Sequence, residues 1–440
     1  MSAHALPTRL QVARSTLRNH PIGALIAQTA GFNIASTGTA ALGGVILARA
    51  MGPGMRGEYA AVTAWFGILL IVGEVGQSAA VCFYVARDPR HARGYVATSR
   101  TMMLVTGTVA LAAGILLAPA LGHGYPGLAE AYRITFAASV IAFIGASYTF
   151  SLQARATMPW NLVRLSQPLL GMLGIIVLWR LRLLSLGTAI DTLIVTMAIQ
   201  LGYAYYWCRR SGLAPGAVQA RLVRPLAAYG LSQLVAITPA ALNMYLDQLV
   251  LSQLVTPADL GRYAIAVSIA MIPAPLVCAI GNVALPRLAA ERTVTAHSRQ
   301  LQRIATAASV VIASAITLPL AVGGTWLIPL VFGPEYAGAV PLLWLLAPGA
   351  VFLSCGTVVG DLLRGLNRPR FVATAQGVAA VFTVILLIAL LPVLGVAAAA
   401  IATSVSYGVA LVVMVRYLWR SPIAELPVNS PSEGDSCVSG

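Results

Sequence analysis

The sequence predicts an all-α polytopic membrane protein of about 12 transmembrane helices, arranged in two pseudo-symmetric six-helix lobes. Charged residues make up 9% of the chain and hydrophobic residues 58%, whereas a soluble domain carries about 25% charged residues. The apolar residues form long blocks that are separated by short arginine-bearing gaps. A helix needs about 20 residues to cross a hydrocarbon core about 30 Å thick, and each block supplies roughly that length.

The blocks define the expected spans in order. Short segments of alternating apolar and polar residues, as in a membrane β-barrel, do not occur, so each block is interpreted as a helix. The expected spans cover residues 22–48, 58–83, 97–120, 132–154, 162–179, 185–207, 227–253, 261–286, 303–331, 340–363, 371–392 and 394–418.

The distribution of basic residues predicts the orientation. The net charge is +15, and all 28 basic residues are arginines. If the N-terminus lies in the cytoplasm, 22 of these 28 arginines fall on the cytoplasmic side. Because an excess of positive charge marks cytoplasmic loops, we expect a protein of the bacterial cell membrane with both termini on the cytoplasmic side. The arginines lie at helix ends among membrane lipids, which argues against nucleic-acid binding.

An internal repeat divides the chain into halves. Two stretches match without gaps at an offset of 204 residues, and each joins a helix end to a Pro/Gly turn and a new helix. The matching pairs are Pro53 and Pro257, Gly57 and Gly261, Tyr59 and Tyr263, and Ala60 and Ala264. Six spans return each half to its starting side, so we expect parallel repeats, an arrangement typical of alternating-access transporters.

The expected domain organisation follows from the repeat. The segments are a cytoplasmic N-terminal segment (1–21), an N-lobe (22–207), a cytoplasmic linker (208–226), a C-lobe (227–418) and a tail (419–440). The tail is rich in Ser, Pro and Gly, and this composition predicts disorder.

One face of the seventh span is small and polar. At 100° per residue, four polar residues fall in one arc: Tyr229, Ser232, Asn243 and Asp247. The equivalent face of the first span carries Gln28, Ser36 and Thr39. These two faces could line a common wet cleft between the lobes, or the small residues could allow tight helix packing. Pro239 predicts a kink in the middle of the seventh span.

Two further groups are candidate sites inside the bundle. Glu74 lies in the second span with Gln77 nearby, and a carboxylate in a membrane is a functional candidate by default. It could be a proton or cation site, a partner for an arginine, or a structural hydrogen-bonded residue. Asp361 and Arg364 are spaced for an ion pair, with contact to an anionic headgroup as the alternative.

Motifs for enzymatic chemistry are missing. The chain lacks a Walker A motif, a His-Glu-x-x-His motif and a Gly-x-Ser-x-Gly motif. The five histidines lack the spacing of metal ligands. We therefore expect neither an enzyme nor a cofactor or metal site.

Several segments also resemble a known family. They cover residues 47–59, 247–252, 261–266, 285–288, 331–343, 364–369 and 395–407. In order and spacing they are similar to the oligosaccharide (O-antigen type, Wzx-like) flippases, whose superfamily includes multidrug exporters and the lipid II flippase. The resemblance implies two lobes in a V shape that move an undecaprenyl-diphosphate-linked glycan from the cytoplasmic to the external leaflet.

The resemblance also implies basic residues near the substrate. No arginine lies deep within the first, second or seventh span, so Arg49, Arg133 and Arg364 are the nearest candidates for holding a diphosphate. The expected partners are the lipid-linked glycan, membrane lipids and other polysaccharide assembly proteins, with the chain itself a monomer.

Three other hypotheses stay open at this point. A cation-coupled small-molecule exporter would use Glu74 or Asp247 as its coupling site. A glycan polymerase or ligase would need a sizeable external loop, and the external loops here are short. A scaffold without transport activity is the third.

Overall fold

The computed structural model describes residues 22–123, 125–290, 296–366 and 368–420. The predicted N-terminal segment 1–21 and most of the predicted tail lie outside these residues. Within them the chain forms helices and no strand, which confirms the expected class. The elements are α2 (Ile22–Gly73), α3 (Gln77–Arg87), α4 (Ala92–Leu121), α5 (Pro126–Arg155), α6 (Thr157–Arg180), α7 (Leu186–Arg210), α8 (Ala220–Leu254), α9 (Pro257–Ala270), α10 (Pro273–Ala290), α11 (Ala296–Phe332), the short 3-10 helix η1 (Pro334–Tyr336), α12 (Ala339–Gly365), α13 (Pro369–Leu394) and α14 (Val396–Trp419).

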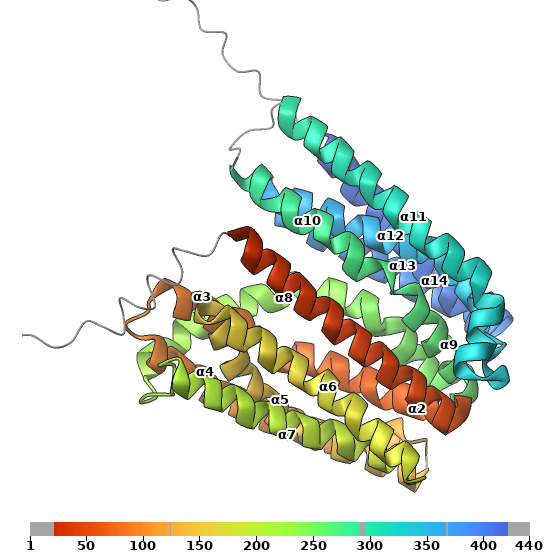
Figure 1. Cartoon of the computed structure of the whole chain (residues 1–440), viewed down its shortest axis with the longest axis horizontal. Helices are drawn as coiled ribbons and strands as arrows, with labels where there is room; N and C mark the ends of the chain where they lie inside the picture. The colour runs from red at the N-terminus through yellow and green to blue at the C-terminus, as the bar shows by residue number, and fades with distance from the viewer. Residues whose placement is uncertain (1–21, 124, 291–295, 367, 421–440) are drawn as a thin grey trace, which may run out of the picture.

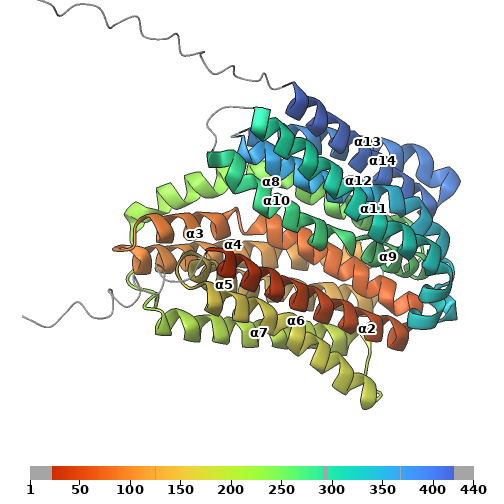
Figure 2. The same ribbon diagram turned by 45° about the horizontal axis from the view of Figure 1, so that its top comes forward.

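Helix α2 contains two membrane crossings. Its 52 residues would reach about 78 Å as one straight helix, far more than a hydrocarbon core of about 30 Å. Gly52 interrupts it with φ 69° and ψ 175°, and Pro53 follows. The chain reverses there, so the first segment (dark red in Figure 2) and the second (orange) run side by side.

The number of crossings agrees with the prediction. Eleven segments of the described chain are long and apolar enough to cross a membrane. Because α2 is counted once but crosses twice, the described residues supply the expected twelve crossings.

The second and eighth spans are each interrupted. The second span breaks between Gly73 and Gln77, where Val75 and Gly76 have φ values of 51° and 65°. The eighth span divides into α9 and α10, and Pro273 starts α10. Since proline lacks a backbone N–H, it is tolerated at the start of a helix.

The helices form two lobes. Figure 1 shows α2 to α7 as one group and α9 to α14 as the other, and each group packs mainly within itself. We call them the N-lobe and the C-lobe. We count α8 with the C-lobe, where it contacts α13; it also contacts α2, α3 and α4 of the N-lobe.

The connection between α7 and α8 is shorter than the predicted linker 208–226. Helix α7 continues to Arg210 and α8 already begins at Ala220. The intervening residues are held against α4, because the Gly216 N–H donates to the Arg93 carbonyl at 3.0 Å. The Gln219 N–H also donates to the Thr98 hydroxyl at 3.1 Å.

Candidate functional site: the contact between the lobes and a polar network in the C-lobe

The two copies of the repeat touch each other. A Cβ atom on Gly57 would collide with the carbonyl of Pro257, and one on Gly261 would collide with the carbonyl of Pro53. Gly57 and Gly261 are repeat-related, and so are Pro53 and Pro257. The contact between α2 and α9 is therefore self-complementary, as across a two-fold axis. We call this place the lobe contact; it supports true duplication.

Three side chains bond across the lobes near the same end. The Trp65 indole donates to the Ser252 hydroxyl at 3.0 Å, and the Tyr336 hydroxyl donates to the Ala48 carbonyl at 3.0 Å. His123 Nε2 lies 3.3 Å from the Ser252 carbonyl oxygen. Each of these bonds must break if the lobes separate at this end.

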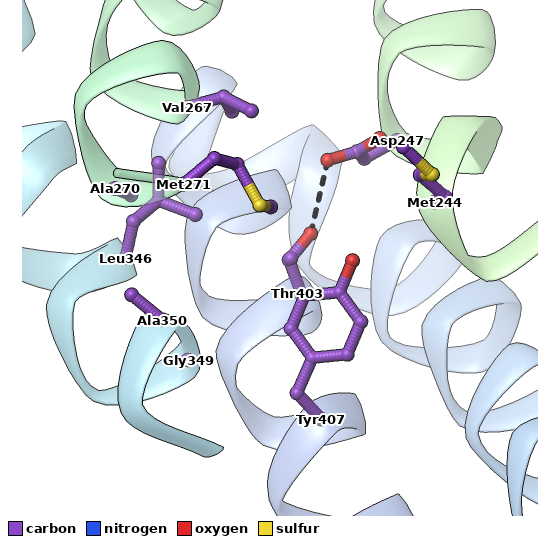
Figure 3. Close-up of a pocket in the computed structure, with 10 residues that line it drawn as sticks. All are labelled: Met244, Asp247, Val267, Ala270, Met271, Leu346, Gly349, Ala350, Thr403 and Tyr407. Atoms are coloured by element: carbon purple, nitrogen blue, oxygen red, sulfur yellow. Dashed lines mark hydrogen bonds between the residues drawn. The ribbon is translucent and has the colours of Figure 1, made fainter. Parts of the chain in front are cut away.

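Asp247 is the centre of a network inside the C-lobe. Its side chain is 3% exposed and accepts hydrogen bonds from the Tyr263 hydroxyl and, at 3.1 Å, from the Thr403 hydroxyl. These groups come from α8, α9 and α14. We call these three residues the Asp247 network; Figure 3 shows Asp247 and Thr403 facing each other above Tyr407.

A small space adjoins the network. Asp247, Thr403, Tyr407 and Met271 line a cavity of about 10 Å³, which is close to the room that one water molecule needs. A buried carboxylate requires hydrogen-bond donors or a cation beside it. The two hydroxyls and the Gln248 N–H, which donates to Asp247 at 2.7 Å, meet part of that need.

Asn243 lies one turn away and belongs to a second cluster. Its amide nitrogen donates to the Gln376 side-chain oxygen at 3.3 Å, and its oxygen accepts from the Thr383 hydroxyl at 2.9 Å. Gln376 also lines a cavity of about 210 Å³ whose wall includes Arg364 and Met244. Met244 lines both this cavity and the space beside Asp247.

The position of Asn243 and Asp247 differs from the one expected. Both are buried, at 4% and 3% exposure, and both bond within their own lobe. The sequence suggested that they face a gap between the lobes. Since α8 packs on α13 here, this polar face is covered by its own lobe. Their part in binding stays a prediction.

The other predicted residues of α8 lie in different surroundings. Tyr229 stacks on Phe83 of α3 with ring centroids 4.5 Å apart. The Ser232 side chain is exposed and its hydroxyl donates to the Tyr229 carbonyl at 2.7 Å. The expected single face is therefore divided between the N-lobe, the surface and the C-lobe.

The equivalent face of the first span packs on α6 of its own lobe. Gln28 contacts the Met158 sulfur at 2.7 Å, and a Cβ on Gly43 would lie 3.4 Å from Met172. The Thr39 hydroxyl donates to the carbonyls of Ala35 and Ser36 within the helix. Gly43 matches Asp247 in the repeat, so the N-lobe has no carboxylate at that place.

Glu74 lies where the second span is interrupted. Its carboxylate accepts a hydrogen bond from the Ser78 hydroxyl at 2.7 Å. Gln77 is 1% exposed and donates to the Leu226 carbonyl of α8 at 3.3 Å. A Cβ on Gly76 would collide with the Gly230 carbonyl. The interruption therefore allows close packing of the N-lobe on α8.

The candidate arginines have separate roles in the structure. Arg364 forms an ion pair with Asp361 at 2.7 Å, as the spacing indicated, and its side chain is half exposed. Arg133 pairs with Glu130 at 3.3 Å on the surface, and Arg49 is exposed. Of the three, Arg364 lines a described cavity.

Some residues of these clusters were not singled out from the sequence. Tyr263 was recognised as part of the repeat but not as a partner of Asp247. Thr383, Gln376 and Thr403 lie on α13 and α14, more than 130 residues from their partners Asn243 and Asp247. In the sequence, these residues differ from their neighbours only in being polar residues within apolar spans, which does not indicate their partners.

The fold and the lobe contact define a helical membrane protein of two repeat-related lobes, which pack on each other through α2 and α9. Comparison of the sequence with known families gives a match over residues 25–291 to the model of the polysaccharide biosynthesis protein family. This match covers more than half of the chain, so the chain belongs to that family.

Two curated proteins match shorter stretches. A membrane protein of Methanocaldococcus jannaschii, described as uncharacterized, is 29% identical over 110 residues, which are 25% of this chain and 22% of that protein. Agl15 of Haloferax volcanii, named as a probable low-salt glycan biosynthesis flippase, is 34% identical over 89 residues, or 20% and 19%. Each match spans about a fifth of the relative's length.

Solved structures share the fold over most of the chain. The lipid II flippase MurJ in an inward closed conformation has a TM-score of 0.74 at 13% identity, covering 89% of this chain and 88% of that one. An inward-facing multidrug resistance MATE family transporter has a TM-score of 0.73 at 14% identity, covering 87% and 94%. Both likenesses concern the arrangement of the helices.

Proposed function

We propose that this protein moves an undecaprenyl-diphosphate-linked oligosaccharide from the cytoplasmic to the external leaflet of a bacterial cell membrane by alternating access. The family match over residues 25–291 carries the proposal. The names of two similar proteins, a glycan biosynthesis flippase and a lipid II flippase, support it. Because such neighbours are flippases and transporters, the polymerase hypothesis is set aside.

In this proposal the two lobes move relative to each other, and the lobe contact is the place where they separate and close. It joins the lobes through backbone packing at Gly57 and Gly261 and through three hydrogen bonds. A few such bonds hold a state that differs from its alternative by a few kcal/mol, which suits two interconverting conformations. Separation of the lobes here would open this end, which we assign to the outside.

Arg364 is the residue we propose to contact the diphosphate. Arg364 lines the cavity of about 210 Å³ together with Gln376, and one nitrogen of its guanidinium pairs with Asp361. Arginine matches phosphate oxygens with several donors in a fixed plane. Asp361 would position this side chain rather than contact the substrate.

A reconstitution experiment tests the proposal. The protein is placed in liposomes with a fluorescent undecaprenyl-diphosphate-linked oligosaccharide, and the fraction that a membrane-impermeant quencher reaches is followed over time. We expect protein-dependent exchange between leaflets, at least about tenfold slower for Arg364→Ala, which corresponds to about 1.4 kcal/mol. Arg90→Ala, in an exposed loop, is the matched control. Exchange no faster than in empty liposomes would exclude the proposal.

The Asp247 network favours a second candidate, a cation-coupled small-molecule exporter. A buried carboxylate beside a one-water space could take a proton or a monovalent cation. MATE multidrug transporters are among the solved structures of similar fold. Efflux of a cationic dye such as ethidium, driven by a sodium or proton gradient and without movement of the lipid-linked glycan, would favour this candidate.

A further inference from the structure

A large pocket lies beside the lobe contact. Its volume is about 600 Å³, within the range of about 300–1,000 Å³ that is typical of small-molecule sites. Glu58, His123 and Tyr125 of the N-lobe form one wall. Ser252, Gln253 and Thr256, around the end of α8, form the other wall. We call this cavity the rim pocket.

The rim pocket holds polar groups that are free to bind a ligand. Within the described part of the chain, the Glu58 carboxylate, the Tyr125 hydroxyl and the Gln253 amide oxygen have no hydrogen-bond partner. The Tyr125 side chain is 71% exposed, so a face of its ring is open to stacking. A second cavity of about 620 Å³ shares Glu58 and Tyr125 with the rim pocket.

The chemistry of these groups identifies the class of ligand. A carboxylate, an amide and the Tyr125 hydroxyl offer both donors and acceptors to a molecule with many hydroxyl groups. An open aromatic ring can cover the apolar face of such a molecule. An anionic phosphate fits poorly, because Glu58 is the one acidic side chain in the described lining and the arginines lie elsewhere.

We propose that the rim pocket is a saccharide site that takes one or two sugar units of a glycan on the external side. The identity of this ligand rests on the proposed function, since the glycan would leave the protein at this end. The site is separate from the Asp247 network and from the cavity that Arg364 lines.

The location of the rim pocket links its occupancy to the state of the lobes. Its two walls belong to opposite sides of the lobe contact, and His123 of one wall lies 3.3 Å from the Ser252 carbonyl of the other. Separation of the lobes at this end would pull the walls apart. A sugar in the pocket therefore stabilises the conformation in which the lobes are closed at this end. The size of this effect is set by how much more tightly the sugar binds the closed conformation than the open one. External glycan would thus slow the next cycle.

Binding of free sugars to the purified full-length protein is the first test. Isothermal titration would use glucose, galactose, N-acetylglucosamine, lactose and chitobiose. We expect at least one to bind, and about tenfold weaker binding in Tyr125→Ala and in Glu58→Gln, because stacking and a charge-assisted hydrogen bond are lost. Glu130→Gln is the matched carboxylate control, since Glu130 lines only the second cavity of the two.

The effect on conformation is the second test. Spin labels at Arg182→Cys and Ala337→Cys, introduced in a cysteine-free variant, report the distance between the lobes at this end. Both positions are exposed. We expect the binding sugar to shift the distances toward the short population in the parent protein and not in Tyr125→Ala.

Two results would overturn the inference: none of the five sugars binds, or binding is the same in Tyr125→Ala, Glu58→Gln and the control. Failure of the proposed function has a different signature. In that case the liposomes show no movement of the lipid-linked glycan, whereas sugar binding and the change in distance persist.

Discussion

At the scale of single residues, the buried carboxylate of Asp247 is the group whose role is best suited to a test by substitution. It is buried beside two hydroxyl donors, from Tyr263 and Thr403, and a space for about one water molecule. A carboxylate in such a place either binds a cation or proton or depends on all of its hydrogen bonds. Substitution separates these roles, because asparagine keeps the shape and removes the charge.

We expect Asp247→Asn to fold and to lower the transport rate at least about tenfold, or about 1.4 kcal/mol. Asp247→Ala should also lower the stability by about 1–3 kcal/mol, because it removes the carboxylate that accepts from both the Tyr263 and the Thr403 hydroxyls. Transport in liposomes and thermal unfolding in detergent measure the two effects. Asp191→Asn, on the exposed surface of α7, is the control. Full transport by Asp247→Asn would assign Asp247 to structure alone.

At the scale of elements, glycines decide how the helices approach each other. The lobe contact places Gly57 of α2 against the backbone of α9. Gly54 lies one turn earlier in the same helix, and a Cβ on it would meet nothing within 4 Å. The two positions form a matched pair, since both substitutions to alanine change the same helix by one methyl group.

Gly57→Ala should force the lobes apart at this end, because its methyl group overlaps the Pro257 carbonyl, whereas Gly54→Ala should leave them closed. The spin-label distances between positions 182 and 337 provide the measurement. Equal distance distributions for the two variants would show that the lobe contact does not control closure.

The interruption of the second span is a separate test at this scale. Gly76 has φ 65°, which disfavours any residue with a Cβ, and it also abuts the Gly230 carbonyl. Gly76→Ala should therefore destabilise the protein by about 1–3 kcal/mol, seen as a lower midpoint of thermal unfolding. Gly171→Ala, in an uncrowded stretch of α6, should be neutral or slightly stabilising. A midpoint unchanged by Gly76→Ala would contradict this account.

At the scale of the whole molecule, the arginine bias predicts the orientation that the proposed direction of transport requires. A fluorescent protein fused after Gly440 should be bright, because it folds in the cytoplasm. The same reporter inserted after Arg182, in the connection between α6 and α7, should be dark. The reversed pattern would place the rim pocket on the cytoplasmic side and remove the basis for an exit site.

The halves of the molecule have the same architecture but different chemistry. Tyr263 of the C-lobe bonds to Asp247. Its counterpart Tyr59 lies beside Arg56, whose Cζ atom is 5.7 Å from the centroid of the Tyr59 ring. The equivalent of Asp247 is Gly43, which packs on Met172. The two halves therefore share the helix arrangement. At the position of Asp247, however, the C-lobe has a buried carboxylate and the N-lobe has a glycine.

Sequence by itself determined the class of this protein and its duplicated plan. Long apolar blocks must become helices in a membrane, since each backbone polar group needs a partner within its own segment. The offset of 204 residues identified Gly57 and Gly261 as equivalent, and the ion pair between Asp361 and Arg364 followed from helical spacing.

Tertiary structure alone decided which faces of the helices meet. Periodicity places Asn243 and Asp247 on one side of α8, but apolar spans are hydrophobic all round and do not reveal what covers that side. The partners Thr383 and Thr403 come from α13 and α14, and the rim pocket exists only where two lobes and two loops converge. Such sites depend on contacts between residues far apart in the chain, which local pattern does not encode.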